Sequence, residues 1–152
     1  RLNLVIADGA DFMIESVDEF DVIIIDSTDP IGPGEALFTD HFYSHAKNRL
    51  AGGGVMVTQN GVPFLQPDEL RSTMHAFQRL FVDWGCYTAC IPTYAGGPMA
   101  FGWGALSPAP RNVSVDMLRE RLTAARLDLA YYTPDVHKAA FSLPRYIEKL
   151  LP

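Results

Sequence analysis

Two carboxylates three positions apart, Asp26 and Asp29, are the residues of this chain best suited to chemistry. They follow the strand-like run 21–25, whose last four residues are β-branched and apolar, so a strand would end just before them. Such a pair can hold an ammonium group while one member accepts its proton as a general base. An alkyl amine with a pKa of about 10 needs that help, because near neutral pH it is almost fully protonated. The spacing also fits a structural alternative, in which Asp29 starts a turn and Asp26 caps backbone amides.

The loop after this pair alternates rigid and flexible positions, with Pro30 and Pro33 beside Gly32 and Gly34. A loop of this kind can close over a site and exclude water, which is useful in group transfer. It can equally be a long connection. Composition leaves both interpretations open.

Other polar residues follow neighbouring apolar runs. Asp8 could accept a hydrogen bond from an exocyclic amine, and Gly9 would let a flat ring approach the backbone. The alternative for this pair is an ordinary tight turn. Gln59 and Tyr94 are each either ligand contacts or plain polar residues at the edge of the sheet.

The periodicity predicts an α/β fold, with a parallel sheet, helices on its faces and an antiparallel hairpin at the edge. The continuous run 21–25 is typical of a strand buried on both faces. Because ligands of such sheets sit beyond the carboxyl ends of the strands, Asp8, Asp26 and Gln59 should share one rim. Strands are expected at 2–7, 21–25, 55–58, 86–94 and 99–106, and helices at 10–17, 39–50 (ended by Gly52, Gly53 and Gly54), from 67, from 114 and after 144.

Composition narrows the class of protein. A net charge of −6 without a basic stripe argues against nucleic acid as a partner and suits a cationic ligand. The four histidines show no metal-ligand spacing, and Cys86 and Cys90 are interpreted as packed free thiols of a cytoplasmic protein. No apolar run approaches a membrane span. The chain opens at Arg1 without Met, so we interpret it as a fragment whose N-terminal portion is absent.

With these residues in view, the chain closely resembles the polyamine aminopropyltransferase family, in particular its bacterial spermidine synthases. The resemblance spans nearly the whole chain, and the block DSTDPIGP followed by IPTY is its most specific part. The matching stretches are DG at 8–9, DVIIIDSTDPIGPGEALF at 21–38, VTQNG at 57–61, CIPTYAGGPMAFGWG at 90–104 and YYTPDVHKAAFSLPRY at 131–146.

The resemblance implies a role for each matched residue. Asp26 would be the catalytic acid/base, and Asp29 would anchor the diamine. It also implies a Rossmann-like, methyltransferase-type catalytic domain over 1–106, with a linker and helical extension at 107–152. The diamine site would comprise Asp26, Ser27, Thr28, Asp29, Gln59 and Tyr94, and the nucleoside site Asp8, Gly9 and Pro33.

The implied reaction transfers an aminopropyl group from decarboxylated S-adenosylmethionine to putrescine, giving spermidine and 5′-methylthioadenosine, with no metal or other cofactor. Family members also carry an N-terminal β-domain and a GGGDG-type loop that this chain lacks, so we expect the chain alone to be inactive. The complete protein would be a homo-oligomer, a dimer or tetramer. Three alternatives remain open: another amine acceptor such as cadaverine or spermidine, an S-adenosylmethionine-dependent methyltransferase, and a non-catalytic module that binds polyamine or nucleoside.

Overall fold

A four-stranded mixed sheet forms the centre of the computed structural model, which describes residues 2–152 apart from the side chain of Pro33. Strands β1 (Phe20–Ile25) and β2 (Leu50–Gln59) are parallel, and β3 (Asp83–Ala89) and β4 (Met99–Ala105) form an antiparallel hairpin. The strand order is β1-β2-β4-β3, with β4 antiparallel to β2. This confirms the predicted α/β class with an antiparallel edge.

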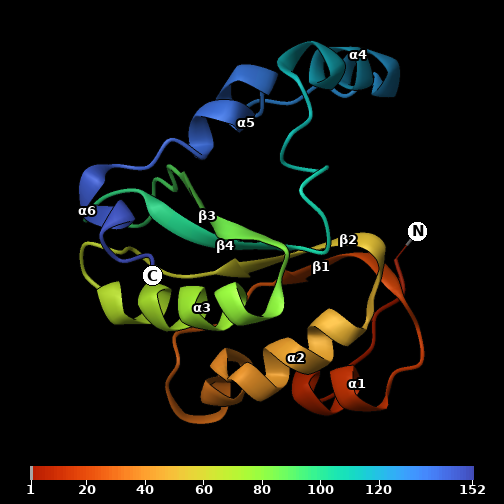
Figure 1. Cartoon of the computed structure of the whole chain (residues 1–152), viewed down its shortest axis with the longest axis vertical. Helices are drawn as coiled ribbons and strands as arrows, with labels where there is room; N and C mark the ends of the chain where they lie inside the picture. The colour runs from red at the N-terminus through yellow and green to blue at the C-terminus, as the bar shows by residue number, and fades with distance from the viewer. Residues whose placement is uncertain (1) are drawn as a thin grey trace.

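Helices lie on both sides of the sheet (Figure 1). Helices α2 and α3 pack on one side, and α4 and α5 lie on the other. None of the helices within residues 2–152 is long and apolar enough to cross a bilayer. The helices are α1 (Gly9–Glu15), the 3-10 helix η1 (Gly32–Phe38), α2 (Asp40–Asn48), α3 (Pro67–Leu80), α4 (Val115–Ala125), α5 (Pro134–Ala140) and α6 (Arg145–Glu148).

The predicted helix starts are confirmed at three positions. Thr39 caps α2 by accepting a hydrogen bond from the backbone N–H of Phe42, and Ser114 caps α4 in the same way. Pro67 occupies the first turn of α3, where its missing N–H costs nothing. The sequence prediction did not include α5, a single short helix that also begins with a proline, Pro134.

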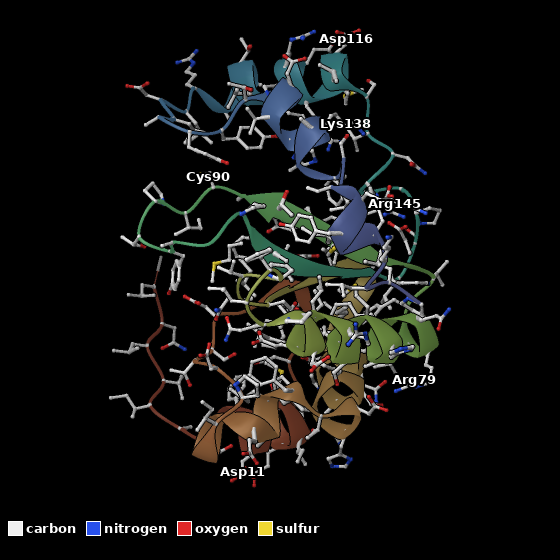
Figure 2. All side chains as sticks on the ribbon, turned by 90° about the vertical axis from the view of Figure 1, so that its left-hand side faces the viewer. Asp11, Arg79, Cys90, Asp116, Lys138 and Arg145 are labelled. Carbon is white, nitrogen blue, oxygen red and sulfur yellow. The ribbon has the colours of Figure 1, made fainter. Side chains whose placement is uncertain are left out.

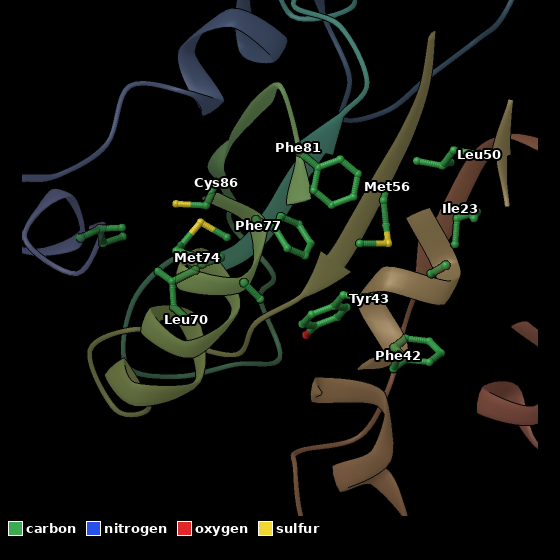
Figure 3. Close-up of a cluster of buried hydrophobic side chains, with 14 residues drawn as sticks. Ile23, Phe42, Tyr43, Leu50, Met56, Leu70, Met74, Phe77, Phe81 and Cys86 are labelled. Atoms are coloured by element: carbon green, nitrogen blue, oxygen red, sulfur yellow. The ribbon is translucent and has the colours of Figure 1, made fainter. Parts of the chain in front are cut away.

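The core lies between the sheet and helices α2 and α3 (Figure 3). Alternate residues of each strand point into it, including Ile23 of β1, Met56 of β2 and Cys86 of β3. From the helices come apolar side chains at helical spacing. These include Phe42, Tyr43, Leu70, Met74 and Phe77. One sheet face is therefore dry, and chemistry must be sought on the other face or at the rim.

Glycines on the core face of β4 let α3 approach the sheet closely. A Cβ at Gly104 would lie 2.6 Å from the ring of Phe81, and one at Gly102 would lie 3.2 Å from Phe77. The two rings themselves form an edge-on pair with centroids 5.1 Å apart. The large side chains of β4, Phe101 and Trp103, alternate with these glycines and so belong to the other face.

Two strand predictions were wrong, because both strand pairing and the covering of a strand's faces depend on distant residues. Residues 2–7 form no strand, and Leu2 and Ile6 are 91% and 94% exposed. An open cavity lies between this segment and β1, so the two backbones cannot form a ladder. Strand β1 is buried on one face only, because no helix of the described chain covers Val22 and Ile24, which are 54% and 72% exposed.

Three element boundaries also differ from the predictions. Helix α2 ends at Asn48, and the glycines 52–54 lie inside β2, where an irregular register between β1 and β2 takes up the extra residues. Strand β3 ends at Ala89, so Tyr94 lies in the following loop. No residue of α4 is fully buried, because that helix stands away from the sheet.

We expect Gly104→Ala to lower the free energy of unfolding of the complete protein by about 2 kcal/mol, because overpacking pushes the ring of Phe81 out of place. Urea denaturation measures the change. The matched control is Gly52→Ala in β2, where an added Cβ meets nothing within 4 Å. It should leave stability unchanged or slightly higher. Equal destabilisation by both substitutions would contradict this account of the packing.

Candidate active site

The face of the sheet opposite the core carries a hollow that we call the Asp26 cavity. It has a volume of about 440 Å³. Asp26 is exposed at its edge, just past the end of β1, and Gln59 and Tyr94 also line it. The cavity is otherwise apolar, with contributions from every strand. The remaining lining residues are Val22, Ile24, Ile25, Val57, Tyr87, Ile91, Met99 and Phe101.

Asp26 also borders a second hollow of about 650 Å³, which we call the Gly9 cavity. Gly9 and Leu37 line it together with residues of the N-terminal segment and α1. Asp26 therefore lies between two hollows, one reaching Gln59 and Tyr94 and the other reaching Gly9. This arrangement brings three other predicted site residues, Gln59, Tyr94 and Gly9, to the two hollows that meet at the carboxylate of Asp26.

Asp8 caps helix α1. Its Oδ1 accepts hydrogen bonds from the backbone N–H groups of Ala10 at 2.8 Å and Asp11 at 3.1 Å. The turn at Asp8 and Gly9 thus has the structural function of an N-cap. Gly9, the next residue, lines the Gly9 cavity, so one turn both caps α1 and forms part of the cavity wall.

Asp29 lies in a different hollow from Asp26. Its side chain is exposed in a shallow site of about 240 Å³. This site also contains Gln66 and Glu69, which belong to the start of α3. The structure therefore does not bring the two aspartates together in one cavity of the described chain. The loop that follows Asp29 folds back closely on it, because a Cβ at Gly34 would lie 3.0 Å from the carbonyl oxygen of Asp29.

Ser27 and Thr28 fill the interval between the two aspartates. The hydroxyl of Ser27 is buried and has no hydrogen-bond partner within the described residues. Thr28 is exposed, and its Oγ1 would lie 3.0 Å from a Cβ at Gly34. Pro33 belongs to η1, but its side chain lies outside what the structure describes.

Sequence reasoning missed Glu69. Both oxygens of its carboxylate are buried without a hydrogen-bond partner in the described chain. Burial, together with the negative charge of nearby Asp29, raises the pKa of Glu69 to about 7. The only sequence signal was a carboxylate in the first turn of α3, and that pattern ordinarily indicates a solvated charge near the positive end of the helix dipole.

A buried hydrogen-bond network fixes the end of β2 next to Gln59. The Oδ1 of Asn60 accepts from the Thr58 hydroxyl at 2.7 Å and from the backbone N–H of Gly102 at 3.0 Å. Its amide Nδ2 donates to Thr73 of α3 at 2.8 Å. Because Asn60 is fully buried, each of these bonds is made in a water-poor environment. The network joins β2, β4 and α3 below the Asp26 cavity.

The remaining candidate residues are dispersed. His41 and His45 form an edge-on pair on α2, and His137 is half-buried on α5, where burial lowers its pKa. Cys86 is a buried free thiol, as predicted, but Cys90 is exposed beyond the end of β3 (Figure 2). Among residues 2–152, no three His, Cys, Asp or Glu side chains gather closely enough to hold a metal ion.

Comparison with known protein families shows which family the chain belongs to. The family model described as the spermine/spermidine synthase domain matches residues 1–113. The chain belongs to this family. The matched part contains the whole sheet, both hollows beside Asp26, and every site residue predicted from the sequence.

Relatives in this family are close in sequence and about twice as long. A polyamine aminopropyltransferase of Ruegeria sp. (strain TM1040) is 64% identical over 100% of this chain, which corresponds to 54% of that protein. Polyamine aminopropyltransferase 1 of Pseudomonas aeruginosa is 48% identical over 97% of the chain and 51% of its own length. The chain thus spans about half the length of the curated relatives it matches.

Solved structures agree with the family and with the predicted Rossmann-like, methyltransferase-type fold. A spermidine synthase in complex with the transition state analogue AdoDATO has a TM-score of 0.88 and 31% identity, over 98% of this chain and 50% of that one. The spermidine synthase of Thermotoga maritima has a TM-score of 0.85 and 30% identity, over 98% and 49%. The sheet described here is therefore a part of that fold.

We expect Glu69→Gln to stabilise the complete protein at pH 8 but not at pH 4. A folded-state pKa of about 7, against 4.5 for the free side chain, means that the folded state holds the proton more tightly. Wild-type stability is therefore lost as pH rises between these values, because the buried carboxylate must become charged. The gain at pH 8 should be about 1 kcal/mol, since solvent screens a partly exposed group.

Urea denaturation at both pH values measures this difference. Glu120→Gln is the matched control, because Glu120 is exposed on α4 and should show no pH-dependent gain. A Glu69→Gln variant that is less stable than wild type at pH 8 would show that the carboxylate is paired in solution.

Proposed function

We propose that the complete protein transfers an aminopropyl group from decarboxylated S-adenosylmethionine to putrescine. The products are spermidine, 5′-methylthioadenosine and a proton. Membership of the family supports the reaction class, and the names of the similar proteins support the aminopropyl group and the product spermidine. The position of Asp26 between two hollows is the observation that carries the proposal.

In this proposal the amine occupies the Asp26 cavity. Its apolar walls suit the methylene chain, and the carboxylate of Asp26 at the edge suits an ammonium end. The family resemblance gives Gln59 and Tyr94 as further contacts of the diamine. Asp29, together with Ser27 and Thr28 of the same loop, would attract the cationic amine. Glu69 of α3 adds a second carboxyl group beside Asp29.

The nucleoside would occupy the Gly9 cavity on the other side of Asp26. Gly9 lacks a side chain, so an adenine ring can approach the backbone there, and Asp8 and Pro33 would complete the contacts. With the amine and the sulfonium on opposite sides of one carboxylate, the attacking nitrogen and the departing sulfur can lie in line. Such positioning contributes much of the catalysis of a displacement reaction.

The proposed reaction requires mainly that the two substrates are positioned and that a proton is removed from the amine. Asp26 accepts the proton of the amine, whose nitrogen lone pair then forms a bond to the aminopropyl carbon. The bond between this carbon and sulfur breaks, and its electron pair leaves with sulfur as a neutral thioether. Because the leaving group departs uncharged, we propose that the reaction uses no metal and no other cofactor.

We propose further that the complete protein works in the cytoplasm as a homo-oligomer, a dimer or tetramer, as the family resemblance implies. The free thiols of Cys86 and Cys90 are consistent with a reducing compartment. Size-exclusion chromatography with light scattering would determine the oligomeric state.

We expect Asp26→Asn to lower kcat of the complete protein by a factor of about 10² to 10⁴, because the amide cannot accept the proton. Release of 5′-methylthioadenosine from saturating decarboxylated S-adenosylmethionine and putrescine measures the rate. The matched control is Asp128→Asn, an exposed aspartate between α4 and α5, which should keep wild-type turnover. Full activity of Asp26→Asn would contradict the proposal and favour a reaction that needs no general base.

The same assay applied to residues 1–152 alone should detect no turnover. The chain spans about half of its relatives, and the family resemblance places further nucleoside and diamine contacts in the other half. Turnover near that of a complete relative would show instead that the described part is sufficient.

A further inference from the structure

A second cavity lies on the same face of the sheet as the Asp26 cavity, between the hairpin β3–β4 and helix α5. Its volume is about 220 Å³, and we call it the aromatic cavity. Thr88, Ala89, Val136 and Ala140 contribute to its lining. Its walls are otherwise rings, namely those of Tyr87, Trp103, Tyr131, Tyr132, His137 and Phe141.

Tyr87 lines both the aromatic cavity and the Asp26 cavity. Its ring stacks on Phe101, its partner across the β3–β4 ladder, with centroids 5.2 Å apart and planes inclined by 16°. It also contacts Phe141 at the end of α5, with centroids 5.4 Å apart and planes inclined by 50°. Two aromatic neighbours therefore hold the ring, and it borders both cavities. Because β3 is the edge strand opposite β1, Tyr87 lies at the end of the Asp26 cavity away from Asp26.

The far side of the aromatic cavity is also fixed. The buried carboxylate of Asp83 accepts a hydrogen bond from the indole N–H of Trp103 at 3.0 Å and forms an ion pair with Arg111. Trp103 in turn meets Phe141 edge-on at 5.5 Å. Lys138 on α5 (Figure 2) donates to the carbonyl oxygen of Arg111 at 2.8 Å, which holds α5 over the sheet.

We propose that the ring of Tyr87 determines the length of the amine acceptor, by closing the end of the Asp26 cavity away from Asp26. This inference rests on the proposed function. A diamine fits on the Asp26 side of the ring, whereas the added aminopropyl arm of a triamine would run into it. Tyr87 is thus a specificity-determining residue, because its ring separates the Asp26 cavity from the aromatic cavity.

The aromatic cavity gives this wall a chemical consequence. Faces of aromatic rings attract alkylammonium groups, and the methylene groups of a polyamine favour the same apolar surroundings. A triamine that passed the position of Tyr87 would therefore find rings suited to its far ammonium group. Removing the ring of Tyr87 joins the two cavities and should convert the aromatic cavity into a subsite for a longer amine.

The test compares two acceptors, putrescine and spermidine, in the complete protein. Tyr87→Ala should raise the ratio of kcat/KM for spermidine to that for putrescine by about tenfold or more, the scale on which pockets discriminate by size. Tyr87→Phe keeps the ring and should keep the ratio within about twofold of wild type. In the double variant Tyr87→Ala/Ala140→Phe, the new ring fills the aromatic cavity and should cancel the gain.

An unchanged ratio in a folded Tyr87→Ala variant would overturn the inference, as would a double variant that keeps the full gain. If circular dichroism shows that Tyr87→Ala does not fold, Tyr87→Leu is judged by the same criteria. Absence of turnover with either amine in the wild type would reject the proposed function instead. Calorimetry with spermidine then tests the wall by itself: binding about tenfold tighter to Tyr87→Ala than to wild type supports it, and equal binding overturns it.

Discussion

The contact between the rings of Phe77 and Phe81 and the bare backbone of β4 determines the arrangement of this molecule. Gly102 and Gly104 have no side chains to hold the helix away, so α3 packs directly onto the strand. The strand then carries all its bulk on the opposite face, as Phe101 and Trp103. One side of the sheet is a closed core, and the other is a surface of rings and hollows.

The candidate site follows from that division. Alternation along the strands sends Val57 and Gln59 to the open face, while Thr58 and Asn60 are buried in a polar network. The network holds the end of β2 on the core side of the sheet, and this fixes the backbone position of Gln59. Asp26 stands at the neighbouring strand end, where two hollows meet. The rim is thus rigid on its core side and open above.

The sequence predicted the parts of this structure that depend on local signals. Capping by Thr39 and Ser114, the proline at the start of α3, and the change from parallel to antiparallel strands were all read correctly. The convergence of Asp26 and Gln59 followed from a general property of parallel sheets. The family resemblance added residue roles that no pattern alone could have given.

What the sequence did not predict depends on contacts between distant residues. Residues 2–7 have the composition of a strand, but pairing requires a neighbouring backbone. Residues 22–25 are all apolar, yet whether both faces of this strand are covered depends on helices far along the chain. The carboxyl of Glu69, which has no hydrogen-bond partner within residues 2–152, and the aromatic cavity arise in the same way. Folding brings α3 to the loop of Asp29, and α5 to β3.

The buried position of Asn60 has a consequence for the chemical lifetime of the protein. Asn60 precedes Gly61, and in a flexible chain the amide nitrogen of a glycine readily attacks the preceding asparagine side chain and releases ammonia. Here both ends of that side chain are engaged, and the backbone turns at Gly61 with φ of 58°. The fold therefore protects the Asn60 side chain from deamidation, and this protection is lost whenever this part of the chain unfolds.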